Sequence, residues 1–260
     1  MSNTRFHVVI PARFASSRFP GKALALLAGR PVLEHVWRQA RRSAAAEVLI
    51  ATDDDRIASA ARSFGAEVVL TRASHRSGTD RAAEVATLRG WPDDALVVNC
   101  QGDAPLIPPA CINQVAALLV AQPGAALATL CTPIVTVEDY RNPNVVKVVC
   151  AADGRALYFS RAPIPSASHA VNAAGEGASA VPPSLRHVGL YAYRAGALRQ
   201  LASAPPCALE AMESLEQLRA LWLGLDIRVA LAVELLGPDV DTPQDLERAA
   251  EFLWRGGVDA

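Results

Sequence analysis

The chain has 260 residues, of which 25 are basic and 26 acidic, so its formal net charge is -1. Apolar residues make up 51% and charged residues 20%, a composition that can bury a core and that excludes an intrinsically disordered chain. The balanced charge excludes the broad basic surface of a duplex-binding protein, so we expect no nucleic-acid partner. The length fits one large α/β domain, and we expect residues 1–260 to form it.

Nothing in the sequence predicts export or membrane insertion. The first residues, MSNTRFHVVIPAR, lack the charged start and long apolar stretch of a signal peptide. No apolar run approaches the length of a membrane span. The five cysteines form no CxxC pair and are odd in number, which indicates reduced core thiols. We therefore expect a soluble cytoplasmic protein without a membrane partner.

Strand and helix patterns alternate through the first half of the chain. The predicted strands are apolar throughout, and the predicted helices repeat apolar residues every three or four positions. This alternation predicts a mostly parallel sheet with helices on both faces. In chain order the elements are strand His7–Pro11, helix Pro31–Arg42, strand Val48–Ala51, helix Asp53–Phe64, strand Glu67–Leu70, helix Thr79–Leu88, strand Leu96–Cys100, helix Ala110–Ala121 and strand Ala125–Leu130.

The second half predicts a smaller β-rich excursion over residues 155–200. Strands Val145–Cys150 and Ala156–Arg161 flank a turn, and a third strand follows at Arg186–Arg194. Between them, Pro163–Ser184 is rich in Pro, Ala, Ser and Gly, a composition typical of a mobile loop or lid. The remaining predicted elements are an amphipathic helix at Leu209–Trp222, a strand-like segment at Val229–Leu236 and a last helix that Asp241 or Thr242 caps, with Pro243 at its first position.

The loop after the first strand has the composition of a phosphate-binding segment. Arg13, Arg18 and Lys22 supply three positive charges within ten residues, and Gly21 lets the backbone approach an anion closely. Open α/β sheets bind ligands at the carboxyl ends of their strands, where this loop lies. A surface loop with solvated arginines is the alternative interpretation.

Lysine usage singles out two positions. Only Lys22 and Lys147 are lysines among the 25 basic residues, so arginine serves almost everywhere else. The two side chains are not interchangeable at a tight site, which indicates a specific role for the remaining lysines. Chance retention is the alternative, and the sequence assigns no partner to Lys147.

Two aspartates follow apolar segments and are candidates for a metal site. Asp103 comes after the strand that ends at Cys100, and Asp241 follows Val229–Leu236. Mg²⁺ usually takes one or two protein carboxylates and completes its shell with water and phosphate oxygens. An aspartate after a strand is more often a turn former or a helix cap, and it is the pairing of the two that favours Mg²⁺.

Several motifs occur in a characteristic order and spacing: PARFASSRFPGK, ATDD, SGTDR, QGDAP, NPNVVKVV, ALYFSRAPIP, RHVGLYAYR, LEQLRALW and VDTPQDLER. Together they resemble the 3-deoxy-manno-octulosonate cytidylyltransferases, or CMP-Kdo synthetases, from about His7 to Arg248. The resemblance implies a Rossmann-like nucleotide-diphospho-sugar transferase fold. It also implies a homodimer, with the strands that flank the excursion as the contact, and a reaction in which CTP and Kdo give CMP-Kdo and pyrophosphate with Mg²⁺ as cofactor.

The resemblance also implies roles for individual residues. Lys22, Arg13, Asp103 and Asp241 would be catalytic, and the two aspartates would bind Mg²⁺. The CTP-binding residues would be Arg13, Arg18, Lys22, Arg76, Ser77, Gly78 and Gln101. The sugar-binding residues would be Arg161, His187, Tyr191, Glu216 and Gln217. His187 and Tyr191 are expected on one face of their strand, with Gly189 leaving room between them.

The chain departs from the family pattern at two positions. Ala104 replaces the usual Glu of QGDEP, and Ala208 stands where a Pro commonly precedes LE. Two alternatives to CMP-Kdo synthesis remain open. One is a cytidylyltransferase for a related acid sugar, such as 8-amino-Kdo or a sialic acid. The other is a catalytically inactive nucleotide-binding module, against which Lys22, Asp103 and Asp241 argue together.

Overall fold

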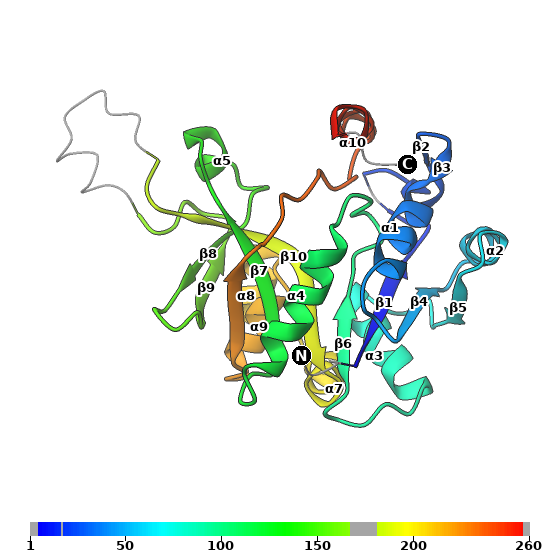
Figure 1. Ribbon diagram of the computed structural model, residues 1–260. Helices are drawn as coiled ribbons and strands as arrows, with labels where there is room; N and C mark the ends of the chain where they lie inside the picture. The colour runs from blue at the N-terminus through cyan, green and yellow to red at the C-terminus, as the bar shows by residue number, and fades with distance from the viewer. Residues whose placement is uncertain (1–4, 17, 167–180, 257–260) are drawn as a thin grey trace.

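The computed structural model describes residues 5–16, 18–166 and 181–256. Its main sheet has nine strands in the order β11-β7-β10-β6-β1-β4-β5, with β8 and β9 attached beside β10 (Figure 1). The strands are β1 (Phe6–Ala12), β4 (Glu47–Thr52), β5 (Glu67–Leu70), β6 (Leu96–Asn99), β7 (Leu127–Pro133), β8 (Lys147–Cys150), β9 (Ala156–Ser160), β10 (Leu185–Arg194) and β11 (Ile227–Leu231).

The sheet is mixed because one central strand is reversed. β1 pairs in parallel with β4 and β6, β4 with β5, and β7 with β11. β10 lies between β6 and β7 and runs antiparallel to both. β8 and β9 form the antiparallel pair expected around the turn at residues 152–154. The prediction of a mostly parallel α/β sheet is confirmed, with β10 as an exception that the periodicity could not indicate.

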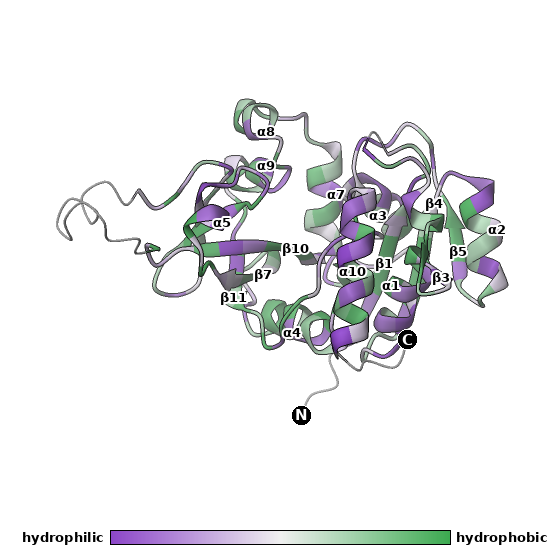
Figure 2. Cartoon of the chain, turned by 90° about the horizontal axis from the view of Figure 1, so that it is seen from above, coloured by the Kyte–Doolittle hydropathy of each residue, from purple (hydrophilic) through white to green (hydrophobic). Residues whose placement is uncertain are grey.

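Helices cover both faces of the sheet, as predicted. One face packs α1 (Val32–Arg41), α2 (Asp55–Ser63) and α4 (Pro109–Val120) against the strands. The opposite face packs α3 (Gly78–Leu88), α7 (Ala195–Ser203) and α9 (Gln217–Trp222). Successive strand residues point to opposite faces, so neighbours along a strand belong to the two different cores. In Figure 2 hydrophilic residues colour much of α10 and α2, whereas β1 and β4 between the helices are hydrophobic.

The last helix, α10 (Pro243–Gly256), packs beside the short hairpin of β2 (Leu26–Leu27) and β3 (Arg30–Pro31), as Figure 1 shows. A capping box starts it. Asp245 N donates to Thr242 Oγ1 at 3.2 Å, and Thr242 N donates to Asp245 Oδ2 at 2.9 Å. Thr242 is therefore the cap, and the side chain of Asp241 is left for another role.

The predicted helix Leu209–Trp222 is wrong as a single element. Two short helices, α8 (Ala208–Glu213) and α9, are separated at Ser214, whose φ of 52° is left-handed. Arg161 stabilises the break, because its Nε donates to Glu213 O at 2.7 Å. The apolar repeat continues across it because both Leu215 and Leu218 face the same core.

The predicted strand Val229–Leu236 is also too long, since β11 ends at Leu231. Beyond this point the backbone hydrogen-bonds to the Gln114 side chain instead of to a neighbouring strand. The Gln114 Nε2 donates to Leu231 O at 2.7 Å, and its Oε1 accepts from Val233 N at 3.0 Å. The sequence analysis missed α5 (Val137–Arg141), α7 and the hairpin of β2 and β3. Most of the predicted loop 163–184 lies outside the described residues.

Two other predictions concern the cysteines and membrane insertion. All five cysteines are free thiols, and four of them are buried. Within the described ranges, none of the helices combines the length and the apolar character needed to cross a bilayer.

Candidate active site

A cleft of about 240 Å³ opens at the carboxyl ends of β1 and β6. Every residue that the sequence analysis assigned to CTP or to metal lines this one cleft, although these residues come from four separate segments. They are Arg13, Arg18, Lys22, Arg76, Ser77, Gly78, Gln101, Asp103 and Asp241. Parallel strands place their carboxyl ends at the same edge, which is how these segments meet.

Lys22 lies between the two predicted metal carboxylates. Its Nζ donates to Asp103 Oδ2 at 2.5 Å and to Asp241 Oδ1 at 2.9 Å. Arg18 forms a further ion pair with Asp241 Oδ2 at 2.9 Å. Burial lowers the pKa of Lys22, but the two carboxylates outweigh it and the net pKa is raised. The ammonium group is therefore charged at neutral pH, and the cleft holds cations and carboxylates in direct contact.

Gly21 directs Lys22 into the cleft. It precedes the 3-10 turn η1 (Lys22–Leu24) with a left-handed φ of 74°. A Cβ at Gly21 would also lie 3.1 Å from the ring of Phe14. The left-handed backbone conformation favours glycine, and the neighbouring ring leaves little space for a side chain, which adds a reason to the close anion approach expected from sequence.

Two further glycines allow the cleft floor to close. A Cβ at Gly102 would lie 2.7 Å from Pro11 O, and a Cβ at Gly78 would lie 2.9 Å from Pro11 Cγ. Both contacts are too short for any larger residue. Gly78 is the first residue of α3, so its lack of a side chain brings the amino end of that helix against β1.

The residues present fit a divalent cation. Asp103 and Asp241 direct one carboxylate oxygen each toward the same ammonium group, so they converge on a single positive charge. Carboxylate oxygens are hard donors, and Mg²⁺ needs only one or two of them from protein when phosphate and water complete its shell. Ala104, in place of the family's Glu, packs against the core beside this pair.

The predicted sugar residues do not line this cleft. Glu216 instead uses both carboxylate oxygens to accept hydrogen bonds from Ser77 Oγ at 2.8 Å and Thr79 Oγ1 at 2.9 Å. Gln217 begins α9 immediately after it. Glu216 therefore touches the helix that carries the predicted nucleotide residues.

Arg161 is occupied by backbone carbonyl groups. Besides Glu213 O, its guanidinium donates to Pro143 O at 2.9 Å and Ser214 O at 3.5 Å. In this structure its contacts stabilise the junction between β9 and the connection from α8 to α9. Its role toward a sugar stays a prediction.

Lys147, which the sequence analysis left without a partner, is fully buried and fully hydrogen-bonded. Its Nζ donates to Val145 O at 2.6 Å, Arg161 O at 2.7 Å and Asn142 O at 3.0 Å. Burial lowers its pKa, and Arg161 adds to the decrease. An ammonium directs three donors toward three acceptors around one nitrogen, which a planar guanidinium cannot do.

His187 and Tyr191 share one face of β10, as predicted. Their ring centroids are 5.2 Å apart, and Phe159 meets His187 edge-on at 5.1 Å. His187 Nε2 lies 3.1 Å from Thr129 Oγ1. Burial lowers the pKa of His187 to about 3 and raises that of Tyr191, so both rings are neutral at pH 7.

Sequence reasoning missed two cleft residues, His75 and Arg81. His75 Nε2 lies 2.5 Å from Glu84 Oε2, which ties the loop before α3 to that helix. Arg81 is buried, pairs with Asp53 at 2.9 Å and donates to Thr71. The signal was available, because ATDD and SGTDR contain Asp53 and Arg81, but spacing alone does not show that they pair.

Comparisons with known proteins now decide the family. A family model described as cytidylyltransferase matches residues 7–227. The 3-deoxy-manno-octulosonate cytidylyltransferase of Pseudomonas syringae pv. tomato is 57% identical over 248 residues, covering 95% of this chain and 98% of that protein. The chain belongs to the 3-deoxy-manno-octulosonate cytidylyltransferase family. It is accordingly a nucleotidyltransferase.

Two further comparisons identify the same family. The enzyme of that name from Pseudomonas fluorescens Pf-5 is 55% identical over 251 residues, covering 96% of this chain and 99% of that one. A solved structure of CMP:2-keto-3-deoxy-manno-octonic acid synthetase complexed with CTP is 39% identical, with a TM-score of 0.86. It covers 97% of this chain, and 99% of its own length is covered. The predicted fold family is therefore confirmed.

Proposed function

We propose that this enzyme transfers CMP from CTP to the anomeric hydroxyl of 3-deoxy-D-manno-octulosonate (Kdo), giving CMP-Kdo and pyrophosphate. The hydroxyl oxygen forms a bond to the α-phosphorus and loses its proton to solvent. The bond from that phosphorus to the oxygen bridging the α- and β-phosphates breaks, and pyrophosphate leaves. The product is the activated sugar for lipopolysaccharide biosynthesis. The observation that carries the proposal is the contact of Lys22 with Asp103 and Asp241 in a cleft lined by arginines.

In this mechanism the chain binds and orients, and no side chain forms a covalent intermediate. Arg13, Arg18 and Lys22 hold the triphosphate by charge. Asp103 and Asp241 would hold Mg²⁺, which supplies charge stabilisation at the phosphates when bound. The amino end of α3, with Ser77 and Gly78, lies where the nucleoside would be oriented, together with Arg76 and Gln101. Positioning of this kind supplies much of the rate enhancement in phosphoryl-type transfers.

The sugar-binding side of the proposal rests on His187, Tyr191, Glu216 and Gln217, with Arg161 nearby. The aromatic face of β10 packs in the same hydrophobic core as α3. The connection that holds Glu216 contacts α3 through the hydrogen bond from Thr79. A homodimer that uses the excursion at residues 155–200, a single domain and a cytoplasmic location belong to the same proposal.

One assay tests the proposal against its alternatives. CTP and Mg²⁺ are offered with Kdo, 8-amino-Kdo or a sialic acid, and pyrophosphate release is measured. The expected result is rapid release with Kdo and a much lower kcat/KM with the other sugars. A higher kcat/KM with another sugar would identify that sugar as the substrate. No release with any sugar, despite CTP binding, would favour an inactive nucleotide-binding module.

A further inference from the structure

One carboxylate joins two parts of the molecule that are far apart in the chain. Glu216 lies in the connection from α8 to α9, and its two oxygens accept hydrogen bonds from Ser77 and Thr79, more than 130 residues earlier. Because both oxygens are used, the side chain holds the two segments together at two points. Hydrogen bonds to a charged acceptor are stronger than those between neutral groups.

A third group, the guanidinium of Arg219, also contacts the Glu216 carboxylate. The Glu216 side chain is 29% exposed, and Arg219 NH2 lies 3.5 Å from its Oε1. Burial raises the pKa of Glu216, while the hydroxyl groups of Ser77 and Thr79 act in the opposite direction. Arg219 is itself fixed by Glu210, with Nε–Oε2 at 2.8 Å and NH2–Oε1 at 2.7 Å. Glu216 therefore has little freedom to leave α3 without breaking several contacts.

On the nucleotide side, the hydrogen bond ends on a residue that shapes the cleft. Ser77 is the N-cap of α3, where its Oγ accepts from Asp80 N at 3.1 Å. Ser77 and Gly78 both line the cleft assigned to CTP. The position of the first turn of α3 therefore depends on the same hydroxyl that donates to Glu216.

On the sugar side, the same connection is anchored to the β-rich excursion. Glu213 accepts from Ser160 Oγ at 2.6 Å and from Arg161 N at 2.9 Å, at the end of β9. Gln217, which like Glu216 itself is expected to bind the sugar, follows Glu216 directly. The connection thus touches both halves of the site, and Glu216 supplies its contact to the nucleotide half.

We propose that Glu216 is a positioning residue that couples the two substrate sites, so that CTP and Kdo each bind more tightly when the other is present. Each ligand binds at one end of the link from Ser77 and Thr79 to Glu216, and because the link holds the two ends together, an adjustment that one ligand favours at its own end is transmitted to the other end. Coupling of this kind is reciprocal by thermodynamic necessity. The inference rests on the proposed function, since it assumes these two substrates.

The test is a matrix of dissociation constants measured by calorimetry with Mg²⁺. The probes are Kdo and the α,β-methylene analogue of CTP, which cannot react. For the wild-type enzyme, saturating Kdo should tighten binding of the analogue about tenfold, and the analogue should tighten Kdo binding by the same factor. Glu216→Ala should reduce this factor to near one.

A second variant breaks the same hydrogen bonds by removing the two donors instead of the acceptor. In the double variant Ser77→Ala/Thr79→Val both hydroxyl donors are missing, and the coupling factor should again fall to near one. Adding Glu216→Ala to that double variant should change the factor no further. If Glu216→Ala does not fold, the double variant alone decides the proposal.

Glu213→Ala is the matched control. It removes a carboxylate from the same connection but breaks only the contacts within the sugar half, so the tenfold coupling should persist even if Kdo binds more weakly. A coupling factor of one in the wild-type enzyme would overturn the inference, as would a factor that survives in both link variants. Normal pyrophosphate release without coupling would overturn the inference alone. Failure of Kdo to bind or react would instead overturn the proposed function.

Discussion

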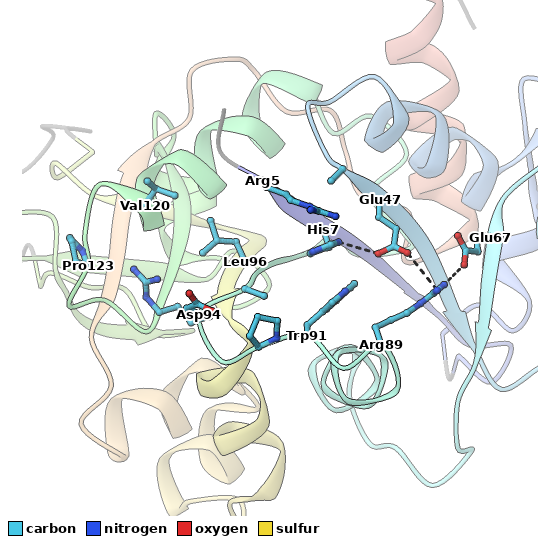
Figure 3. Close-up of a pocket in the computed structure, with 14 residues that line it drawn as sticks. Arg5, His7, Glu47, Glu67, Arg89, Trp91, Asp94, Leu96, Val120 and Pro123 are labelled. Atoms are coloured by element: carbon cyan, nitrogen blue, oxygen red, sulfur yellow. Dashed lines mark hydrogen bonds and ion pairs between the residues drawn. The ribbon is translucent and has the colours of Figure 1, made fainter. Parts of the chain in front are cut away.

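The two edges of the central sheet use charged residues in opposite ways. At the amino ends of the strands lies a cleft of about 1140 Å³, several times larger than the cleft at the carboxyl ends (Figure 3). In it His7 stacks on Trp91 with ring centroids 4.1 Å apart, and His7 Nδ1 lies 3.1 Å from Glu47 Oε2. Arg89 pairs with both Glu47 and Glu67.

At the carboxyl ends the smaller cleft contains charged side chains of both kinds, paired and unpaired. Lys22 and Arg18 bridge to carboxylates that come from distant segments. The guanidinium groups of Arg13 and Arg76 line this cleft and make neither a hydrogen bond nor an ion pair with a residue in the described ranges. Cleft size therefore does not identify the active site. The difference is one of charge balance: the larger cleft leaves Arg5 and Asp94 unpaired within the described ranges, one charge of each sign, whereas the smaller cleft leaves two cations, as binding of a polyanion would require.

The strongest test of this comparison removes the carboxylates at the active edge. If they hold Mg²⁺ as proposed, Asp103→Asn or Asp241→Asn should each lower kcat/KM by several hundredfold or more, because loss of such a carboxylate would cost about 4 kcal/mol of transition-state stabilisation. Pyrophosphate release at limiting Mg²⁺ measures the effect, and circular dichroism checks folding. Normal turnover in either variant would mean that the substituted residue is not a metal ligand.

Replacing the lysine by arginine tests whether the geometry, rather than the charge alone, is required. Lys22→Arg should be nearly as damaging as Lys22→Ala, a loss of about 3 kcal/mol or roughly a hundredfold in rate. Two carboxylates lie within 2.9 Å of one nitrogen, and a planar guanidinium does not fit that arrangement. Single-turnover rates at saturating CTP measure it.

Arg248→Lys is the matched control, because the Arg248 side chain is 73% exposed, does not line the cleft and should tolerate the exchange. A Lys22→Arg enzyme that keeps most of the wild-type rate would mean that lysine at this position is a chance retention.

Acid should destabilise the enzyme through the buried aromatic face of β10. Burial lowers the pKa of His187 to about 3, whereas in the unfolded chain it is about 6.5. As pH falls from 7 to 5 the unfolded chain takes up a proton that the native protein does not, so this residue lowers the free energy of unfolding by about 2 kcal/mol. Denaturant unfolding at both pH values measures it, and His187→Asn should lose this share of the decrease. An unchanged pH dependence in that variant would mean that His187 titrates normally.

At the opposite edge, substitution should affect stability without affecting catalysis. Glu47→Gln weakens the contacts to His7 and Arg89 and should cost about 1–2 kcal/mol of unfolding free energy. The values of kcat and KM for both substrates should stay within twofold of wild type. A large loss of turnover in a folded Glu47→Gln enzyme would show that this edge participates in function.

The smallest expected effects concern the sugar. His187→Ala and Gln217→Ala should each raise the KM for Kdo more than that for CTP, by about 0.5–1.5 kcal/mol or roughly 2- to 13-fold. Steady-state kinetics with each substrate varied in turn gives the comparison. Equal changes in the two KM values would place these residues outside the sugar pocket.

Much of the site was predictable from sequence because its parts are local. Arg13, Arg18 and Lys22 share one loop, and both that loop and Asp103 lie just after strands that the apolar pattern identifies. In a sheet whose strands are parallel, the carboxyl ends lie at one edge, so position along each segment predicted that the loop and Asp103 lie at the same edge, but not that Asp103 and Asp241 meet. The family resemblance added the nucleotide residues Arg76, Ser77, Gly78 and Gln101 and all of the sugar residues, whose spacing carries no chemical signal of its own.

Other features depend on contacts between segments that local periodicity does not encode. The apolar pattern of β10 is the same for either direction, so only packing between β6 and β7 decided that it runs antiparallel. The repeat through residues 209–222 is likewise compatible with one helix or two, and Arg161 bound at the break decided for two. The partners of Glu216 and Lys147 were set in the same way. Each group must satisfy its hydrogen bonds when buried, and the acceptors or donors that satisfy them are brought within reach only by the tertiary fold.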